Sequence, residues 1–490
     1  MSEYYDKYKK YLDKYLFLKR MKKTHNKELK VVYNFIIVKD GTLKIEISAN
    51  ENIDWFLGEQ WCTDDLNDKI ILNKTDSRIE YEISKDIPQF KDDRLYCYPM
   101  VRNEKEFYAC FTGVIGLYLP SVEDDFVTFS ITFKTNYPLF VSGIGLIEDQ
   151  KTLKTNLFKL KNQLFVFTKS YEDSENVLLT YKKDSYFFVD KELMIKNVSD
   201  FIEKCYSFFC LKEDVKFLVN YNGYLLDKKE TITGYGGNGN YAGFNYLVTE
   251  KRKTKEIQEK INIYLLHELY HHFNRSSGYQ SNWFSEGFTE FFSRYLSMDK
   301  KSFIKECNKF IELYWKNPYK NSKIDIMTRE NFWNNKFIER LPYVKGFVYA
   351  LYNLQRYKTE FIERYKTIIV NRYKNPQLKE DNALLNDYLK DDNFDKYILK
   401  GKTIKIKGDY TKKINSLNIG FDLDTAIYKK KITNIKKELD AYKKGVRNGE
   451  VEQIEINEKE GTILIKQNKK TITVNIFTGI KIDIPQIEDI

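Results

Sequence analysis

The first part of the chain has the hydrophobic pattern of β-strands. Between about residues 28 and 187, apolar residues alternate with polar ones or form short continuous runs, and polar turns separate these segments. Alternation is clear at 42–49 and 126–134, whereas 162–169 is almost continuously apolar. A period of two is typical of half-buried strands, and short apolar runs are typical of strands buried on both faces. The pattern predicts an all-β, sandwich-like domain.

After about residue 197 the apolar period changes to that of helices. The predicted helices span 197–210, 254–274, 284–297, 301–315, 343–357, 359–373 and 378–390. Strand-like alternation returns at 402–408, 452–458, 461–467 and 471–477, with a short helix near 440–444. We therefore expect a multidomain α+β protein with a β domain, a mostly helical domain and a small C-terminal β domain.

The N-terminal segment has an amphipathic helical pattern. Tyr4, Tyr8, Tyr11, Tyr15 and Leu18 are four or three residues apart, which places them on one face of a helix. The opposite face carries net positive charge, so a membrane surface is one partner that fits. Acidic residues interrupt that basic face, however, and we therefore expect the helix to dock on the protein's own core.

Composition and charge exclude several classes of protein. The 490 residues include 81 Lys and Arg against 70 Asp and Glu, a net charge of +11 that is scattered along the chain. Nucleic-acid-binding proteins concentrate positive charge, so we expect no nucleic-acid partner. No apolar run approaches the roughly 20 residues that span a bilayer, and the N-terminus lacks the apolar core of a secretory signal. The six cysteines form no CxxC pair, so we expect reduced thiols and a cytoplasmic location.

Three of the four histidines lie within six residues of one another. His267, Glu268 and His271 form the pattern HExxH in a predicted helix. Residues four apart share a helix face, so both imidazoles can bind one metal ion. Glu268 lies about 100° around the helix, where it can reach a metal-bound water, and His272 faces away from the ligands. The alternative is an ordinary buried helix with two satisfied histidines.

A catalytic zinc site needs a third protein ligand. The predicted helix 284–297 carries Glu286 and Glu290 one turn apart among aromatic residues. Glu286 can complete the coordination, and Glu290 can accept a hydrogen bond from a ligating imidazole and fix its tautomer. The alternative is two carboxylates on a solvated face, but the aromatic neighbours predict burial, where unpaired acids are costly. Two histidines and a glutamate favour zinc over other divalent ions.

Together these motifs resemble those of the gluzincin metallopeptidases, specifically the aminopeptidase N and glycyl aminopeptidase branches. Their zinc helix is followed by a glutamate in an E-G-F context, as at Glu286. The segment 341–354 is similar to the family's P-Y-x-K-G-F segment, whose tyrosine corresponds to Tyr343. The resemblance implies a peptidase that hydrolyses peptides or proteins with zinc-activated water. Glu268 would transfer the proton of that water, and Tyr343 would donate to the oxyanion.

The resemblance also implies a domain organisation. Segments 419–424 and 441–456 are similar to part of a PDZ domain, which glycyl aminopeptidases carry after the catalytic domain. Residues 1–190 would then form the N-terminal helix and the β domain. Residues 191–398 would form a thermolysin-like, mostly helical zinc metallopeptidase domain, and 399–490 a PDZ-like domain.

Two features depart from the family pattern. The 14 residues between His271 and Glu286 are a shorter connection than the relatives have, although two antiparallel helices can still meet. The family also places an acidic residue on a Gly-rich strand that binds the substrate's free amine. The corresponding strand here lies within 233–247, and no Asp or Glu occurs between Glu230 and Glu250. Its candidate substrate-binding residues are Gly236, Gly237, Asn238, Gly239 and Asn240, whose backbone can pair with an extended peptide.

These departures leave three functional hypotheses. An aminopeptidase is the family default, and an endopeptidase without free-amine recognition is favoured by the missing strand acid. A catalytically inactive, zinc-containing PDZ scaffold is the third, although all five residues needed for hydrolysis are present. Hydrolysis of free or N-terminally blocked peptides distinguishes the three.

Overall fold

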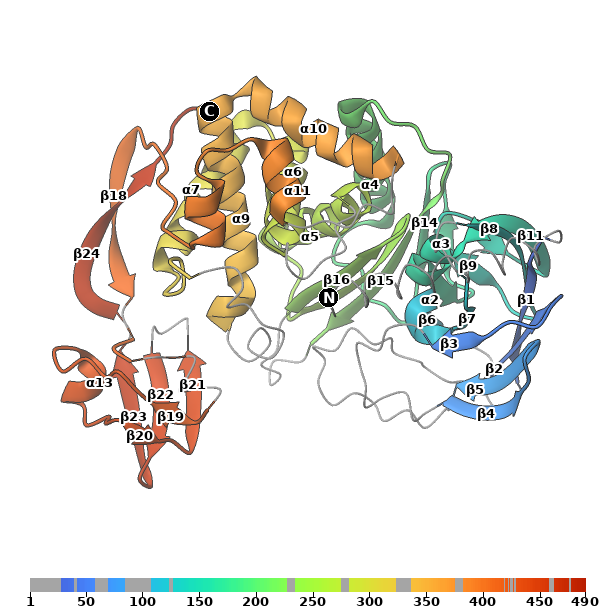
Figure 1. The fold of residues 1–490 in the computed structure, drawn as a ribbon, viewed down its shortest axis with the longest axis horizontal. Helices are drawn as coiled ribbons and strands as arrows, with labels where there is room; N and C mark the ends of the chain where they lie inside the picture. Colours follow the sequence, from blue (N-terminus) through green and yellow to red (C-terminus); the bar gives the residue numbers. More distant parts are fainter. Residues whose placement is uncertain are drawn as a thin grey trace, which may run out of the picture. The chain divides into compact units, whose positions relative to one another are not determined.

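The computed structural model describes most of the chain in two compact units (Figure 1). The described residues are 28–38, 42–57, 69–83, 107–122, 127–226, 234–274, 282–322, 336–374, 382–417, 419–421, 423, 426, 429–457, 462–475 and 477–490. One unit comprises Met1–Ile195 and Asp214–Thr254, and the other comprises Lys196–Glu213 and Lys255–Ile490. The predicted N-terminal amphipathic helix lies outside the described residues. Among the helices that are described, none is long and apolar enough to cross a membrane.

A six-stranded sheet forms the first layer of the N-terminal unit. Its order is β11-β8-β1-β2-β5-β4, with bounds Gln150–Asn156, Thr128–Thr135, Lys30–Ile37, Leu43–Ala49, Arg78–Ile83 and Lys69–Lys74. In β1 the side chains of Val31, Tyr33 and Phe35 are buried and alternate with partly exposed ones. This is the predicted period of two, which places one face of a strand in the core.

A four-stranded sheet packs against this layer and is buried on both faces. Its order is β10-β9-β12-β6, with bounds Gly145–Ile147, Leu139–Val141, Leu164–Phe167 and Ala109–Thr112. Phe165 and Phe167 of β12 belong to the core shared with the six-stranded sheet, whereas Leu164 and Val166 pack toward a third sheet. Burial on both faces explains the continuous apolar run at 162–169. The predicted β-sandwich is confirmed.

Short elements connect these sheets. They are the strands β3 (Trp55–Leu57) and β7 (Tyr118–Pro120), which pair with each other, and the helices α2 (Gly113–Gly116) and α3 (Leu157–Asn162). The side chain of Asn156 caps α3 by accepting a hydrogen bond from the backbone N–H of Lys159 at 2.9 Å.

The third layer is a five-stranded mixed sheet with the order β13-β14-β15-β17-β16. Its bounds are Tyr171–Asp173, Val177–Tyr181, Phe217–Leu225, Gly243–Glu250 and Gly234–Asn240. β14, β15 and β17 are parallel, and β16 pairs antiparallel with β17 at the sheet edge. We did not predict β15, because asparagines interrupt its apolar run, and the single Gly-rich strand predicted within 233–247 is instead the hairpin of β16 and β17. Asn220 and Asn222 are buried and donate to the hydroxyl of Tyr108, at 2.7 and 2.8 Å.

The second unit is mostly helical. Its principal helices are α4 (Lys191–Phe209), which begins in the first unit, α5 (Lys255–Asn274), α6 (Asn282–Ser297), α7 (Lys300–Lys316), α9 (Lys336–Tyr357), α10 (Thr359–Lys374) and α11 (Asn382–Leu389), followed by a π-helical turn, η4 (Asp395–Leu399). Each predicted helix of this region is found, although α4 and α9 begin earlier than predicted and the start of the helix predicted at 378–390 lies outside the described residues. Tyr365 of α10 stacks on Phe292 of α6 with ring centroids 3.8 Å apart and hydrogen-bonds Tyr270 of α5. An aromatic core thus joins these three helices.

The C-terminal segment leaves the helices and returns to them. β18 (Tyr410–Leu417) and β24 (Phe477–Gln486) form an antiparallel ribbon. Between them lie β19 (Lys431–Ile432), α13 (Asp440–Lys443), β20 (Gly449–Glu450), β21 (Gln453–Asn457), β22 (Thr462–Gln467) and β23 (Lys470–Asn475). After β24, Asn308 of α7 exchanges two hydrogen bonds with the backbone of Ile487, at 2.8 and 2.9 Å. The PDZ likeness and the three domain boundaries stay predictions.

The predicted strand at 402–408 is wrong. Ile404 and Ile406 are buried on alternate positions, as the pattern required, but the segment pairs with no strand. Its backbone instead donates hydrogen bonds to side chains of helices. The N–H of Ile404 donates to the hydroxyl of Tyr314, and the N–H of Lys407 donates to the side chain of Gln355. Alternating burial therefore reflects an extended segment lying on helices.

Candidate metal centre

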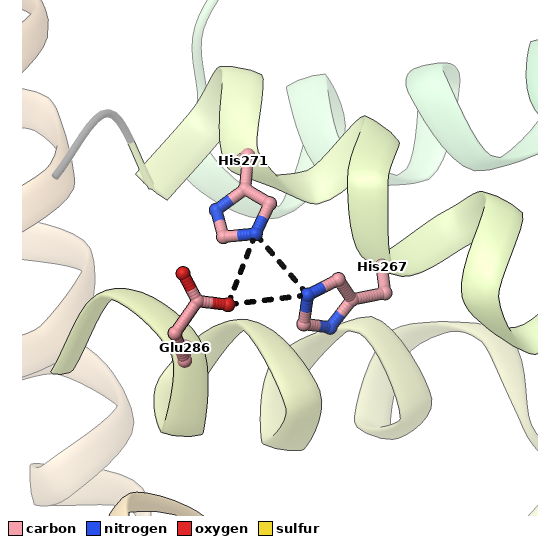
Figure 2. A group of neighbouring side chains, drawn as sticks. All are labelled: His267, His271 and Glu286. Carbon is pink, nitrogen blue, oxygen red and sulfur yellow. Dashed lines mark hydrogen bonds and ion pairs between the residues drawn. The ribbon is translucent and has the colours of Figure 1, made fainter. Parts of the chain in front are cut away.

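Two histidines of α5 and a glutamate of α6 converge (Figure 2). The Nε2 atoms of His267 and His271 lie 3.1 Å apart. One carboxylate oxygen of Glu286 lies 3.5 Å from Nε2 of His267 and 3.4 Å from Nε2 of His271. The i, i+4 spacing places both imidazoles on the same helix face. The structure thus brings together the three residues that the sequence predicts as metal ligands.

The separations of these three atoms fit a zinc ion. Tetrahedral zinc with bonds of about 2.0–2.1 Å places neighbouring ligand atoms roughly 3.3 Å apart, and the observed values lie on either side of this. Two imidazoles and one carboxylate are also a donor set of catalytic zinc sites, which leave one position for water or substrate. Elsewhere in the described part of the chain, no other cluster of three or more His, Cys, Asp or Glu residues converges in this way.

The charges around the group favour a cation. Burial opposes protonation of His267, but the carboxylates of Glu290, Glu286 and Glu268 outweigh it and raise its pKa to about 10. Burial also opposes ionisation of the glutamates. The two histidines nevertheless hold the pKa of Glu286 well below its usual range, and Arg294 with His267 lowers that of Glu290 to about 2. Two ionised carboxylates beside the histidines attract positive charge, which a divalent cation can supply.

Glu268 and Tyr343 lie beside the metal group. Glu268 is half-buried and close enough to His267 to contribute to its raised pKa. The ring of Tyr343, on α9, stacks near that of His267 with centroids 6.1 Å apart and planes at 26°. The predicted oxyanion donor therefore adjoins a predicted ligand, although the two are 76 positions apart in the chain.

Two glycines set the distance between α6 and α9. A Cβ atom on Gly346 would lie 1.9 Å from the carbonyl oxygen of Trp283, and one on Gly287 would lie 2.3 Å from the Cα of Gly346. Neither contact leaves room for a side chain. Gly287 directly follows Glu286, and Gly346 is three residues after Tyr343. The close crossing of α6 and α9 therefore determines the distance between the helix that carries Glu286 and the helix that carries Tyr343.

Asn274 fixes the junction between α5 and α6. Its side-chain amide donates to the carbonyls of Phe284 and Ser285, at 3.3 and 3.1 Å, and to the hydroxyl of Thr289 at 3.0 Å. Arg372 donates to the backbone carbonyl of Asn274 at 2.5 Å. Sequence reasoning missed this asparagine, because a polar residue at a helix end usually indicates only a cap or a turn.

Behind His267 lies a buried series of charged residues. The Nδ1 atom of His267 is 3.6 Å from a carboxylate oxygen of Glu290. That oxygen also accepts from Arg294, which in turn pairs with Glu306 of α7 at 3.2 Å. Glu290 was predicted to support a ligand, whereas Arg294 and Glu306 were missed. The feature of the sequence that could have revealed Arg294 was its i, i+4 spacing from Glu290 on an otherwise aromatic helix.

The histidine that directly follows the motif contacts a different set of residues. His272 is buried rather than at the surface, and its Nε2 lies 2.7 Å from the hydroxyl of Tyr373 and 3.5 Å from a carboxylate oxygen of Glu213. It contributes no atom to the three-residue metal group. The candidate substrate-binding residues, Gly236, Gly237, Asn238, Gly239 and Asn240, form the edge strand β16 of the first unit. Their role stays a prediction.

Comparison with known proteins relates the fold to solved structures. The chain is 13% identical to an aminopeptidase N family protein from Idiomarina loihiensis, with a TM-score of 0.60, and the alignment covers 94% of this chain and 96% of that one. Yeast LTA4 hydrolase, native and in complex with bestatin, is 12% identical, with TM-scores of 0.44 and 0.43; 76% and 77% of this chain and 65% and 68% of those chains are covered.

At the level of sequence, no protein-family model and no curated protein matches the chain. The structural likeness at this low identity concerns the fold. The chain therefore has a multidomain fold of helices and sheets similar to that of an aminopeptidase N family protein.

Proposed function

We propose that this chain is a zinc-dependent metallopeptidase. The observation that carries the proposal is the convergence of His267, His271 and Glu286 within 3.1–3.5 Å, with Glu268 and Tyr343 beside them. The likeness of the fold to an aminopeptidase N family protein supports the same class of reaction. When bound by these ligands, zinc polarises the scissile carbonyl and lowers the pKa of a bound water.

The chain's own residues perform the proton transfers. Glu268 accepts the proton of the attacking water and passes it to the leaving amine, the usual role of the glutamate in HExxH. The hydroxyl of Tyr343 donates to the developing oxyanion, and removal of one such donor typically costs about 2.7–4 kcal/mol of transition-state stabilisation. Glu290 orients His267 through its Nδ1.

The family resemblance makes an aminopeptidase the leading assignment. In this proposal the substrate binds as an extended strand to the backbone of β16, at Gly236, Gly237, Asn238, Gly239 and Asn240. β16 supports this role because it is the edge strand of its sheet in the described part of the chain.

An endopeptidase is the second candidate. The observation that favours it is the absence of Asp and Glu from residues 231–249, since recognition of a free α-amine normally requires a carboxylate. Without that carboxylate, a peptide with a blocked N-terminus binds as well as one with a free N-terminus.

One assay tests both candidates. The purified chain is analysed for bound zinc and incubated with matched peptide libraries that have free or acetylated N-termini. Release of N-terminal residues from free peptides alone supports an aminopeptidase, and internal cleavage of both libraries supports an endopeptidase. If the zinc-loaded chain cleaves neither library, the proposed function is wrong and the non-catalytic scaffold is favoured.

A further inference from the structure

The buried charges behind His267 connect three helices. Glu290 and Arg294 are on α6, Glu306 is on α7, and His267 is on α5. The side chains of Arg294, Glu290 and Glu306 are 4%, 7% and 13% exposed, so water competes little for their hydrogen bonds. Charged residues of α6 and α7 are thus connected to His267, a predicted metal ligand on α5.

Arg294 holds Glu290 in one orientation. Its Nη1 donates to the carboxylate oxygen of Glu290 that faces His267 and also to the backbone carbonyl of Glu290, at 2.9 Å for the latter. Its Nε donates to Glu306 at 3.2 Å, and its guanidinium lies 5.0 Å from the ring centroid of Phe310. With two of its three nitrogens and one face engaged, the guanidinium has little rotational freedom.

Glu306 is held in turn from the solvent side. Lys309, which is 57% exposed, donates to both of its carboxylate oxygens at 3.0 Å. The series therefore runs from an exposed lysine through two carboxylates and a guanidinium to Nδ1 of His267. In the described structure that buried nitrogen has no hydrogen-bond partner, and the Glu290 oxygen contacts it as an ion pair at 3.6 Å.

Stability alone is a poor explanation for such a series. Buried ion pairs lose about as much hydration free energy as they gain from attraction, and apolar replacements are often neutral or stabilising. Residues behind a metal ligand, by contrast, fix the ligand's orientation and tautomer and change metal affinity when removed.

We propose that Arg294 and Glu306 are positioning residues of the metal centre, which hold Glu290 against Nδ1 of His267 so that Nε2 faces the other two ligand atoms. The inference rests on the metal site of the proposed function but requires no particular substrate. It extends the centre to α7, a helix that contributes no ligand.

Zinc affinity of the full chain, measured by competition with a chelator of known affinity, tests this inference. We expect Arg294→Met to weaken zinc binding by about tenfold or more, and Arg294→Lys and Glu306→Gln to weaken it less. In a Glu290→Gln background, Arg294→Met should cause no further loss, because Arg294 acts through Glu290. Lys305→Met is the matched control, since Lys305 is an exposed lysine of α7 outside this series, and its substitution should leave affinity unchanged.

Thermal unfolding of the metal-free variants separates positioning from a structural role. Unchanged zinc affinity in Arg294→Met and Arg294→Lys, with a lowered melting temperature, would overturn the inference. If Arg294→Met does not fold, unchanged affinity in both Arg294→Lys and Glu306→Gln overturns it. A wild-type chain that binds zinc but hydrolyses no peptide refutes the proposed function and leaves this inference standing, whereas one that binds no zinc refutes both.

Discussion

The crossing of α6 and α9 gives the sharpest steric prediction. In Gly346→Ala, the new methyl group would lie 1.9 Å from the carbonyl oxygen of Trp283 and 2.8 Å from the Cα of Gly287. Both neighbours are helix backbone, so no side-chain rotation relieves the contact. The helices must separate by about 1.5 Å before that methyl–oxygen distance reaches an ordinary contact.

Two opposing effects determine the loss of stability. Overpacking of this kind costs about 1–3 kcal/mol, and alanine in a helix regains about 1 kcal/mol relative to glycine. The indole of Trp283 is fully buried among Phe288, Tyr349 and Phe394, so α6 cannot move away without disturbing that core. We expect a net destabilisation of up to about 2 kcal/mol.

The larger effect falls on activity. Separation of the helices moves Tyr343 away from Glu286, and a misplacement of about 1 Å can cost about 10²-fold in rate. Measurement of kcat/KM, zinc content and the free energy of unfolding tests this. Tyr343→Phe is the matched comparison, since it should lower kcat without changing stability or zinc content. Wild-type stability together with wild-type kcat/KM in Gly346→Ala would refute the argument.

Three further predictions concern ligands, titration and packing. His271→Ala should bind less than one zinc per chain under conditions in which wild type is saturated, as elemental analysis can measure; full occupancy would contradict the ligand assignment. Burial lowers the pKa of Lys345 to about 8, so the unfolded chain binds more protons between about pH 8 and 10.5 and stability should rise with pH across that interval. Denaturant titrations should show that Lys345→Met loses this rise, and an identical pH dependence would contradict it. Asn274→Ala, which removes the three hydrogen bonds that its amide donates and the one that its oxygen accepts from Arg372, should cost about 1–3 kcal/mol of stability, and an unchanged denaturation midpoint would contradict that role.

The sequence predicted the metal group because its residues are close in the chain and their types are diagnostic. An i, i+4 pair of histidines determines geometry within one helix. Glu286 followed on the next predicted helix, and Tyr343 was found only through its family motif. The positions of the helices were predictable because a long amphipathic pattern is a strong signal for a helix.

What the sequence missed depends on contacts between distant segments. Asn220 of β15 and Asn245 of β17 resemble loop residues in the sequence, but Asn220 donates to the hydroxyl of Tyr108 and to the side-chain oxygen of Asn245. Residues 402–408 alternate like a strand, but helices satisfy their backbone groups. The sequence analysis did not single out Arg294, whose ion pair with Glu306 joins two different helices. Such features depend on tertiary partners, which local periodicity does not encode.

In the proposed mechanism, a metal held by His267, His271 and Glu286 acts with Glu268 as the base. The most direct test compares peptide hydrolysis by wild type and Glu268→Gln at equal measured zinc content. Glu259→Gln is the matched control, since Glu259 is an exposed residue of the same helix. We expect a loss of about 10²–10⁴-fold in kcat for Glu268→Gln and wild-type hydrolysis for the control. Equal turnover by zinc-loaded Glu268→Gln and wild type would contradict it.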